Sequence, residues 1–324
     1  MQMDKITEDV KDGLALSVLI ATRDRAQLLE ATLGHLRRQQ LDGFDWEVVV
    51  VDNGSTDETA AVLERAAEHV PLVVLREPEA GKNRALNRAL DAARGRLLVF
   101  TDDDMELAPR WLAGYCEAAD RWPDYSIFCG PITPIYPDAT PAWLREHPYA
   151  GPAYAKFAPP QEEGPLTSAT LPFGGNYAVR SRVMSGVRFC LKLGPKGKSF
   201  PLGDETELLR RLCAQGERVV YLPEANTGHC IQPHQITLDW LLKRAFNIGR
   251  GMARLNPNHN GAGGAGGSWS ARYQLTLNWA RQAMSAFSGE RRRFEAGAQF
   301  QYLRGRLFEQ KLMAAEAKET PPEA

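Results

Sequence analysis

The chain has 324 residues, with 39 Lys and Arg against 40 Asp and Glu, for a formal net charge of −1. A charge this close to zero argues against a protein that coats nucleic acid, because such proteins usually contain a strongly basic domain. The N-terminus is polar, no run of about 18 apolar residues occurs, and the five cysteines are scattered. These features predict a cytoplasmic protein with unpaired thiols, which is either dissolved in the cytoplasm or bound at the inner face of the membrane.

The first third of the chain alternates between predicted strands and helices. The strands are predicted at 16–21, 46–51, 71–75 and 96–100, and the helices at 26–39, 56–68 and 83–93. The strand segments are apolar and partly β-branched, as in parallel strands that are covered on both faces. This alternation predicts an α/β fold with a doubly wound, mostly parallel sheet flanked by helices.

The middle of the chain is rich in proline. Ten of the 21 prolines lie between Pro131 and Pro172, so this segment is predicted to be a long ordered loop rather than helix or central strand. It carries the aromatic residues Trp143, Tyr149, Tyr154 and Phe157, which either form a platform for a ligand or pack into the loop's own core. Beyond it, strands are predicted at 176–180 and 218–222, and helices at 204–215 and 240–255.

The last quarter of the chain is predicted to be a helical extension. A Gly-rich linker covers 256–268, helices at 271–287 and 290–315 make up the segment 269–315, and 316–324 is predicted to be a disordered tail. The two helices carry more basic than acidic residues. Such a face suits a peripheral contact with an anionic membrane, packing against the rest of the chain, or a homodimer.

Three consecutive carboxylates, Asp102, Asp103 and Asp104, directly follow the strand predicted at 96–100. Ligands of open α/β sheets bind at the carboxyl ends of the strands. A divalent cation with oxygen ligands would neutralise these charges and could be shared with substrate phosphates. The alternative is a solvated acidic turn that caps a helix.

Polar residues also follow the other three predicted strands of the first third. They are Thr22, Arg23 and Asp24 after the first strand, Asp52 and Asn53 after the second, and Gly81, Lys82 and Arg84 after the third. The last group begins a helix and suits a diphosphate. There is no GxGxxG after the first strand and no Walker A spacing, which argues against a dehydrogenase and a P-loop enzyme.

Taken together, these segments resemble a known enzyme family. Ser17–Asp24, Val48–Asp57, Gly81–Asn87 and Thr101–Asp104 resemble the nucleotide-binding half of an inverting glycosyltransferase of the GT-A fold, family 2. Residues 173–180 resemble the acceptor-side strand of that family, and 203–208 resemble its general-base motif. The resemblance implies a catalytic domain over 1–255, with nucleotide-sugar binding in 16–105 and the acceptor side and general base in 131–250.

The resemblance also implies roles for single residues. On the donor side, Thr22, Arg23 and Asp24 would line the nucleoside pocket, Asp52 and Asn53 would bind the base or ribose edge, Lys82 and Arg84 would assist at the diphosphate, and Asp102 with Asp103 would lie near the ribose. Asp104, Asp102 and His229 would ligate Mn²⁺ or Mg²⁺. On the acceptor side, Gly174, Gly175, Asn176 and Trp143 would contact the acceptor.

The general base is expected in the pair Asp204 and Glu205. The family usually has Glu-Asp, with the second residue as the base, so position favours Glu205 and residue type favours Asp204. Among the later basic residues, Lys243, Arg244 and Arg250 are expected on a solvated helix face, or one of them would contact the diphosphate.

The implied activity is a metal-dependent, inverting transfer of a sugar from a nucleotide-diphospho-sugar, with UDP favoured, to an acceptor hydroxyl. The acceptor would be a saccharide, a lipid-linked compound or a small molecule. The alternatives are a sugar nucleotidyltransferase and a non-catalytic protein that binds nucleotide sugars. The first of these usually has a Gly-rich loop after the first strand, where this chain reads ATRDRAQLL.

Overall fold

The computed structural model describes residues 14–41, 43–167, 170–197, 200–257, 276–279, 281–282, 285 and 289–319. The strands are β1 (Leu16–Thr22), β2 (Trp46–Asp52), β3 (Leu72–Arg76), β4 (Leu97–Phe100), β5 (Met105–Leu107), β6 (Ile127–Cys129), β7 (Ile132–Ile135), β8 (Gly164–Leu166), β9 (Tyr177–Arg180), β10 (Val219–Tyr221) and β11 (Thr227–Cys230). The helices are α1 (Ala26–Arg37), α2 (Thr59–Ala67), α3 (Lys82–Ala92), α4 (Trp111–Arg121), α5 (Ala142–Glu146), α6 (Ala150–Tyr154), α7 (Asp204–Ala214), α8 (Leu238–Leu255) and α10 (Glu290–Glu319), with 3-10 turns at Ser181–Met184 and Pro233–Ile236.

A large sheet forms the centre of the molecule and confirms the predicted α/β class. Its strand order is β3-β2-β1-β4-β9-β6-β10-β8. Strands β3, β2, β1 and β4 are parallel, and β9 lies antiparallel between β4 and β6. The chain runs outward from β1 to β3 and then returns to β4 on the other side of β1. This reversal creates a switch point between β1 and β4, where open α/β sheets bind their ligands.

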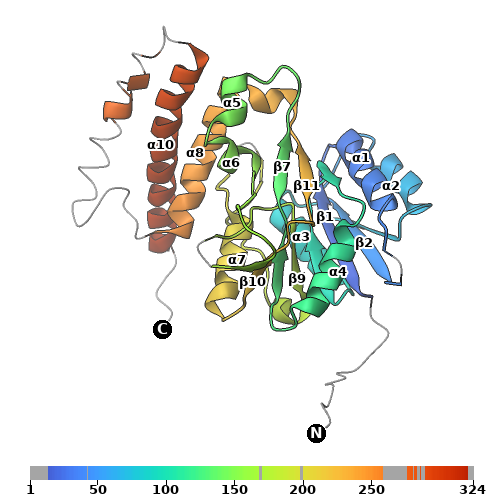
Figure 1. The fold of residues 1–324 in the computed structure, drawn as a ribbon. Helices are drawn as coiled ribbons and strands as arrows, with labels where there is room; N and C mark the ends of the chain where they lie inside the picture. The colour runs from blue at the N-terminus through green and yellow to red at the C-terminus, as the bar shows by residue number, and fades with distance from the viewer. Residues whose placement is uncertain are drawn as a thin grey trace.

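The apolar residues of β2 are completely buried inside the sheet. Val48, Val49, Val50 and Val51 are all 0% exposed, as expected for parallel strands with helices on both faces. The connections through α1 and α2 move outward along the sheet, from β1 to β3, whereas the connection through α3 moves back to β4. Since such crossovers are right-handed, α3 lies on the face of the sheet opposite α1 and α2. Figure 1 shows α1 and α2 together at one side of the sheet.

The proline-rich segment contains more regular structure than predicted. Instead of one long loop it forms β7, α5, α6 and β8. Its strands are edge strands: β7 carries Pro134 at one edge of a three-stranded sheet, β5-β11-β7, and β8 carries Pro165 at the end of the large sheet. An edge strand tolerates proline because one side of its backbone needs no hydrogen bond.

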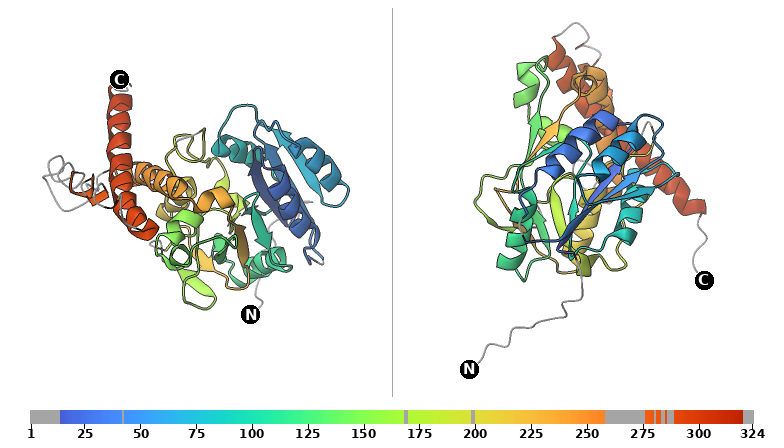
Figure 2. Two further views of the ribbon diagram at one scale, coloured as in Figure 1. Left: turned by 90° about the horizontal axis from the view of Figure 1, so that it is seen from above. Right: turned by 90° about the vertical axis from the view of Figure 1, so that its right-hand side faces the viewer.

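The C-terminal helices pack on the rest of the protein through a second, smaller core. Leu144, Tyr154, Leu241 and Phe294 are buried there, contributed by α5, α6, α8 and α10. Figures 1 and 2 show α8 and α10 side by side, at the opposite end of the molecule from α1 and α2. Among the residues that the structure describes, no helix combines the length and the apolar character needed to cross a bilayer.

The helix predicted at 290–315 is confirmed, but it continues to Glu319. The expectation of a disordered tail from residue 316 is therefore wrong for 316–319. The reason is that Glu316 forms ion pairs with Arg254 of α8 and with Lys192, which hold the last turns of α10. Residues 320–324 and most of the predicted linker 256–268 and helix 271–287 lie outside the described residues.

Candidate active site

One cavity of about 750 Å³ opens at the switch point of the sheet, within the size range of small-molecule sites. Thr22, Arg23 and Arg25 reach it from the end of β1, and Asp102, Asp103 and Asp104 from the end of β4. Gly81 and Lys82 belong to the start of α3, and Asp204 and Glu205 to the start of α7. The cavity therefore collects most of the predicted donor-side residues and the predicted base in one space.

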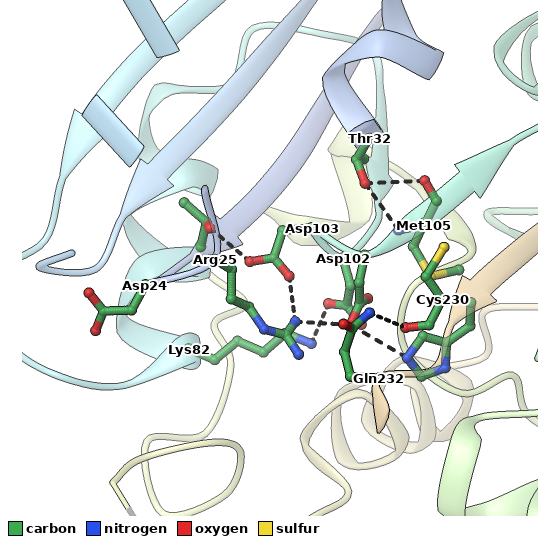
Figure 3. A network of polar contacts seen from close by, with 12 residues as sticks. Asp24, Arg25, Thr32, Lys82, Asp102, Asp103, Met105, Cys230 and Gln232 are labelled. Atoms are coloured by element: carbon green, nitrogen blue, oxygen red, sulfur yellow. Dashed lines mark hydrogen bonds and ion pairs between the residues drawn. The ribbon is translucent and has the colours of Figure 1, made fainter. Parts of the chain in front are cut away.

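Asp103 and Asp104 are held by an arginine that the sequence analysis did not single out. Arg25 Nη1 lies 2.6 Å from Asp103 Oδ1 and 2.9 Å from Asp104 Oδ2, and Thr22 Oγ1 donates to Asp103 Oδ2 at 2.7 Å. Figure 3 shows Arg25 and Asp103 side by side, with a dashed line between them. Burial raises the pKa of Asp103 to about 6, although Arg25 opposes this shift. Arg25 thus reduces the repulsion between the two carboxylates.

His229 reaches Asp104 because β11 pairs with β5, which directly follows the acidic run. His229 Nε2 lies 3.6 Å from Asp104 Oδ2, and its Nδ1 lies 2.7 Å from the carbonyl oxygen of Tyr154. Burial would raise the pKa of Asp104, but His229 and Arg25 hold it well below its usual range. A ring whose Nδ1 is bonded to a carbonyl offers Nε2 as a ligand atom.

Asp104 and His229 therefore suit a divalent cation, since carboxylate oxygen and imidazole nitrogen are both ligands of Mn²⁺-type ions. Asp102, the third expected ligand, instead faces Lys82, whose Nζ lies 2.7 Å from its Oδ1. In the described part of the chain no group of three His, Cys, Asp or Glu residues is arranged around one ion. Of the three expected ligands, Asp104 and His229 lie together, so an ion bound between these two would need further oxygen ligands.

Lys82 connects the acidic run with the candidate base. Its Nζ lies 2.7 Å from Asp102 Oδ1 and 3.0 Å from Glu205 Oε1. Burial lowers the pKa of Lys82, but the two carboxylates reverse this and raise it well above its usual value. In Glu205, burial raises the pKa and Lys82 lowers it, with a net lowering. Lys82 is therefore charged, and it keeps Glu205 ionised inside the cavity.

Asp204 has a different environment from its neighbour Glu205. It is 1% exposed, its Oδ2 has no hydrogen-bond partner among the described residues, and burial together with the charge of Glu205 raises its pKa well above the usual range. The Oδ1 of Asn83 also has no hydrogen-bond partner among the described residues, and a Cβ on Gly194 would be 2.8 Å from each of the two oxygens. Asp204 thus fits a neutral carboxyl, and Glu205 is the ionised carboxylate of the pair.

The predicted donor residues divide into two groups. Thr22, Arg23, Asn53, Lys82, Asp102 and Asp103 line the cavity, whereas Asp24, Asp52 and Arg84 are not among its described lining residues. Asn53 lies at the wall, but its side chain is used internally. Its Oδ1 accepts from the Gly81 amide, and its Nδ2 donates to the Glu77 and Glu79 carbonyls.

The three donor residues outside the cavity also have structural partners. Asp24 accepts from the backbone and hydroxyl of Thr56, and Asp52 accepts from the amide of Ser55. Arg84 pairs with Glu79. These residues, with Asn53, therefore hold the loops after β2 and β3 in shape. The sequence had instead led us to expect that they contact the donor.

The predicted acceptor residues are mostly structural. Asn176 is 0% exposed and accepts from Trp111 Nε1 and Tyr115 Oη, while its Nδ2 donates to the Pro131 and Ala225 carbonyls. Trp143 packs on Phe294 of α10, with ring centroids 5.5 Å apart. The expectation that Asn176 and Trp143 bind the acceptor is corrected, because other protein groups already use both side chains.

The two glycines before Asn176 contribute space rather than contacts. Gly174 lines the cavity, and a Cβ there would lie 2.1 Å from Glu205 Oε1. Gly175 adopts a φ of +97°, which favours glycine, and a Cβ there would lie 3.3 Å from Asp102 Oδ2. Only small residues at these positions leave room for the two carboxylates.

Comparison with known proteins identifies a matching family. The family model described as Glycosyl transferase family 2 matches residues 17–189, which is more than half of the chain. The GalNAc(5)-diNAcBac-PP-undecaprenol beta-1,3-glucosyltransferase of Campylobacter jejuni is 34% identical over 109 residues, covering 33% of this chain and 35% of that protein. The chain spans only about a quarter to a third of the length of the curated relatives it matches.

Two solved structures resemble the whole fold. The mannosyltransferase PcManGT from Pyrobaculum calidifontis, in complex with GDP-Man and Mn²⁺, has a TM-score of 0.59 at 20% identity and covers 92% of this chain and 87% of its own. Residues 1–349 of S. aureus TarS, in complex with UDP-GlcNAc, have a TM-score of 0.56 at 12% identity, covering 94% and 92%. At these identities the likeness establishes a shared fold.

Proposed function

The chain belongs to glycosyl transferase family 2, and from this premise we propose that it transfers a sugar from a nucleotide-diphospho-sugar to an acceptor hydroxyl by a single, inverting displacement. One observation carries the proposal. A single cavity contains both the Asp104–His229 pair, which suits a divalent cation, and the ionised carboxylate of Glu205. A donor diphosphate and an acceptor hydroxyl can therefore be bound side by side.

Glu205 is the proposed general base. Its Oε1 is held by Lys82, which leaves Oε2 to accept the proton of the acceptor hydroxyl as that oxygen attacks the anomeric carbon. The bond between the anomeric carbon and the diphosphate oxygen breaks on the opposite side of the sugar, so the configuration inverts. Because Lys82 keeps the carboxylate ionised, the base is ready at neutral pH.

Asp104 and His229 are the proposed protein ligands of Mn²⁺ or Mg²⁺. A cation held there would neutralise the departing diphosphate and share its oxygens as further ligands. Arg25 meanwhile balances the charge of Asp103 and Asp104. The presence of GDP-Man and Mn²⁺ in one solved relative, and of UDP-GlcNAc in another, supports this donor class; of the two nucleotides we propose UDP.

The proposal is tested by exchanging each carboxyl of the pair for its amide. Glu205→Gln should lower the transfer rate by roughly 10²- to 10⁴-fold, the usual contribution of a general base, while the affinity for UDP with Mn²⁺ stays within about twofold. Asp204→Asn should keep most of the activity, because an uncharged amide would replace a carboxyl whose pKa burial raises well above the usual range. Glu207→Gln, whose carboxylate pairs with Arg211 on the same helix, is the matched control.

The measurement is UDP release from a panel of UDP-sugars with Mn²⁺ and with saccharide, lipid-linked and small-molecule acceptors. Full activity of Glu205→Gln, or loss of activity in Asp204→Asn alone, would refute the assignment of the base. Release of pyrophosphate from a nucleoside triphosphate and a sugar phosphate would identify a nucleotidyltransferase instead. Binding of UDP-sugar without any turnover would identify a non-catalytic protein.

We further propose a peripheral membrane contact through α10. Its exposed residues include Arg304, Phe308, Lys311 and Leu312, which combine basic and apolar character as membrane-surface helices do. The protein should therefore co-sediment with anionic vesicles but not with zwitterionic ones, and an Arg304→Glu, Lys311→Glu variant should lose this binding. A dimer in solution that buries Phe308, with no vesicle binding, would overturn this proposal in favour of the homodimer.

A further inference from the structure

A short segment, residues 200–203, leads directly into the helix that carries the proposed base, and we call it the base loop. Phe200, Leu202 and Gly203 of this loop line the cavity. Gly203 is the N-cap of α7 and adopts a φ of +104°, which favours glycine. Because Glu205 follows only two residues later, any shift of the base loop also shifts the base.

Helix α8 contacts the base loop at three positions. The carbonyl oxygen of Asn247 accepts from the amide of Leu202 at 3.2 Å. A Cβ on Gly251 would lie 1.7 Å from the carbonyl oxygen of Leu202, and a Cβ on Gly203 would lie 2.7 Å from Leu255 Cδ1. Positions 247, 251 and 255 are four residues apart, so they lie along one side of α8. The base loop therefore packs directly against the backbone of α8 at Gly251.

Helix α10 supports α8 from another side. A Cβ on Gly249 would lie 2.0 Å from the carbonyl oxygen of Tyr302. Arg250 and Arg254 both pair with the buried carboxylate of Glu309. The sequence had led us to expect Arg250 on a solvated helix face or at the diphosphate, but it is only 8% exposed because it makes this pair. Since α10 holds α8 in this way, α8 has little freedom to move away from the base loop.

The carboxylate of Glu205 is also confined on its other sides. Its Oε1 lies 3.0 Å from Lys82 Nζ, and a Cβ on Gly174 would lie 2.1 Å from the same oxygen. Glu205 therefore has little room to compensate for a displaced base loop by changing its side-chain conformation. A displacement of the loop would instead separate Glu205 from Lys82.

We propose that Gly251 is a positioning residue for the reaction. Its lack of a side chain lets the base loop pack on α8, and this packing sets the position of Glu205. The inference rests on the proposed function, because it concerns the base of that reaction. It also extends the catalytic unit toward the C-terminus, since Gly251 and its support α10 lie beyond residue 189, where the match to the family model ends.

Gly251→Ala is the test of this role. Carbon and oxygen atoms approach to about 3.3 Å at closest, so the added Cβ would displace the base loop by about 1.6 Å. A misplacement of about 1 Å can cost roughly 10²-fold in rate, and a loss of this size is expected in kcat, measured by UDP release. The acceptor KM and the affinity for UDP with Mn²⁺ should stay unchanged, because Asp104 and His229 belong to other elements.

Gly249→Ala is the matched control, because it adds the same atom to the same helix two residues away. Its Cβ would press on α10 instead of the base loop. Helix α10 lies at the end of the molecule (Figure 1), where it can move outward. This variant should therefore have a lower Tm but an unchanged kcat. An equal loss of kcat in Gly249→Ala and Gly251→Ala would overturn the proposal, because general damage to α8 would then explain both.

Leu255→Ala is a second variant, which adds no atom and loosens the contact with Gly203. It should lower kcat by a smaller factor than Gly251→Ala, again without a change in the acceptor KM. If Gly251→Ala does not fold, this variant alone decides, and an unchanged kcat in it would overturn the proposal.

Crystal structures of the unaltered protein and of Gly251→Ala provide a readout that needs no turnover. The separation of Lys82 Nζ and Glu205 Oε1, which is 3.0 Å in the unaltered chain, should increase in the variant. An unchanged separation, or an unchanged kcat of the folded variant, would overturn the proposal. Failure of the proposed function would instead appear as full activity in Glu205→Gln, an outcome on which the two crystal structures do not depend.

Discussion

Replacing Glu309 by glutamine should destabilise the protein strongly, although Glu309 lies on α10 and is not among the described residues that line the cavity. Its side chain is 0% exposed and accepts from Arg250 Nε at 2.6 Å and from Arg254 Nε. Removing one partner of a buried ion pair costs about 3–5 kcal/mol, because the other charge stays buried. Arg254 would keep Glu316 as a partner, so the lower end, about 3 kcal/mol, is expected.

Urea unfolding followed by tryptophan fluorescence measures this loss of stability. Glu316→Gln is the matched control, because Glu316 belongs to the same network but its side chain is 42% exposed. Exposed pairs contribute about 0–1 kcal/mol, so this variant should unfold within about 1 kcal/mol of the unaltered protein. If Glu309→Gln also falls within about 1 kcal/mol, the view that its buried charge holds α10 on α8 is wrong.

Three further predictions concern the cavity. In Lys82→Gln the acid limb of the pH–rate profile should move to higher pH, because Lys82 lowers the pKa of Glu205 and the base is active only above that pKa; an unmoved limb would contradict this role. Gly174→Ala should lower kcat at least tenfold by displacing Glu205, with little change in Tm, whereas Gly114→Ala, where a Cβ meets nothing within 4 Å, should leave kcat unchanged. Asp104→Asn should remove the effect of Mn²⁺ on UDP affinity in a titration with and without EDTA, and an undiminished Mn²⁺ effect would exclude Asp104 as a ligand.

The parts of the site that follow strands were predictable from the sequence. Asp102–Asp104 come directly after an apolar strand, and Lys82 begins a helix, so local pattern and the geometry of parallel sheets suffice to bring them to one edge. Helix α4 was missed although Trp111, Leu112 and Tyr115 recur at helical spacing. That signal is local and could have been used.

Other features depend on contacts between distant segments, which a single sequence does not encode locally. Arg25 and Asp103 are 78 positions apart in the chain. Nothing in the local sequence distinguishes an arginine that pairs with a buried carboxylate from one that lies on the surface. Asn176 looks like a ligand-binding amide, but Trp111 and Tyr115 occupy its oxygen. The partners of a buried polar group are set by tertiary packing, so residue type alone could not distinguish the two cases.

Helix α8 has consequences for how such an enzyme can be redesigned. The positions facing the cavity, 240, 244, 248, 252 and 255, are separate from the positions that dock on α10, such as Gly249 and Arg250. A library confined to the five cavity positions would therefore change the lining of the cavity while the docking side continues to hold the helix in place. Helix α8 thus offers one side for varying the cavity and another for anchoring the helix.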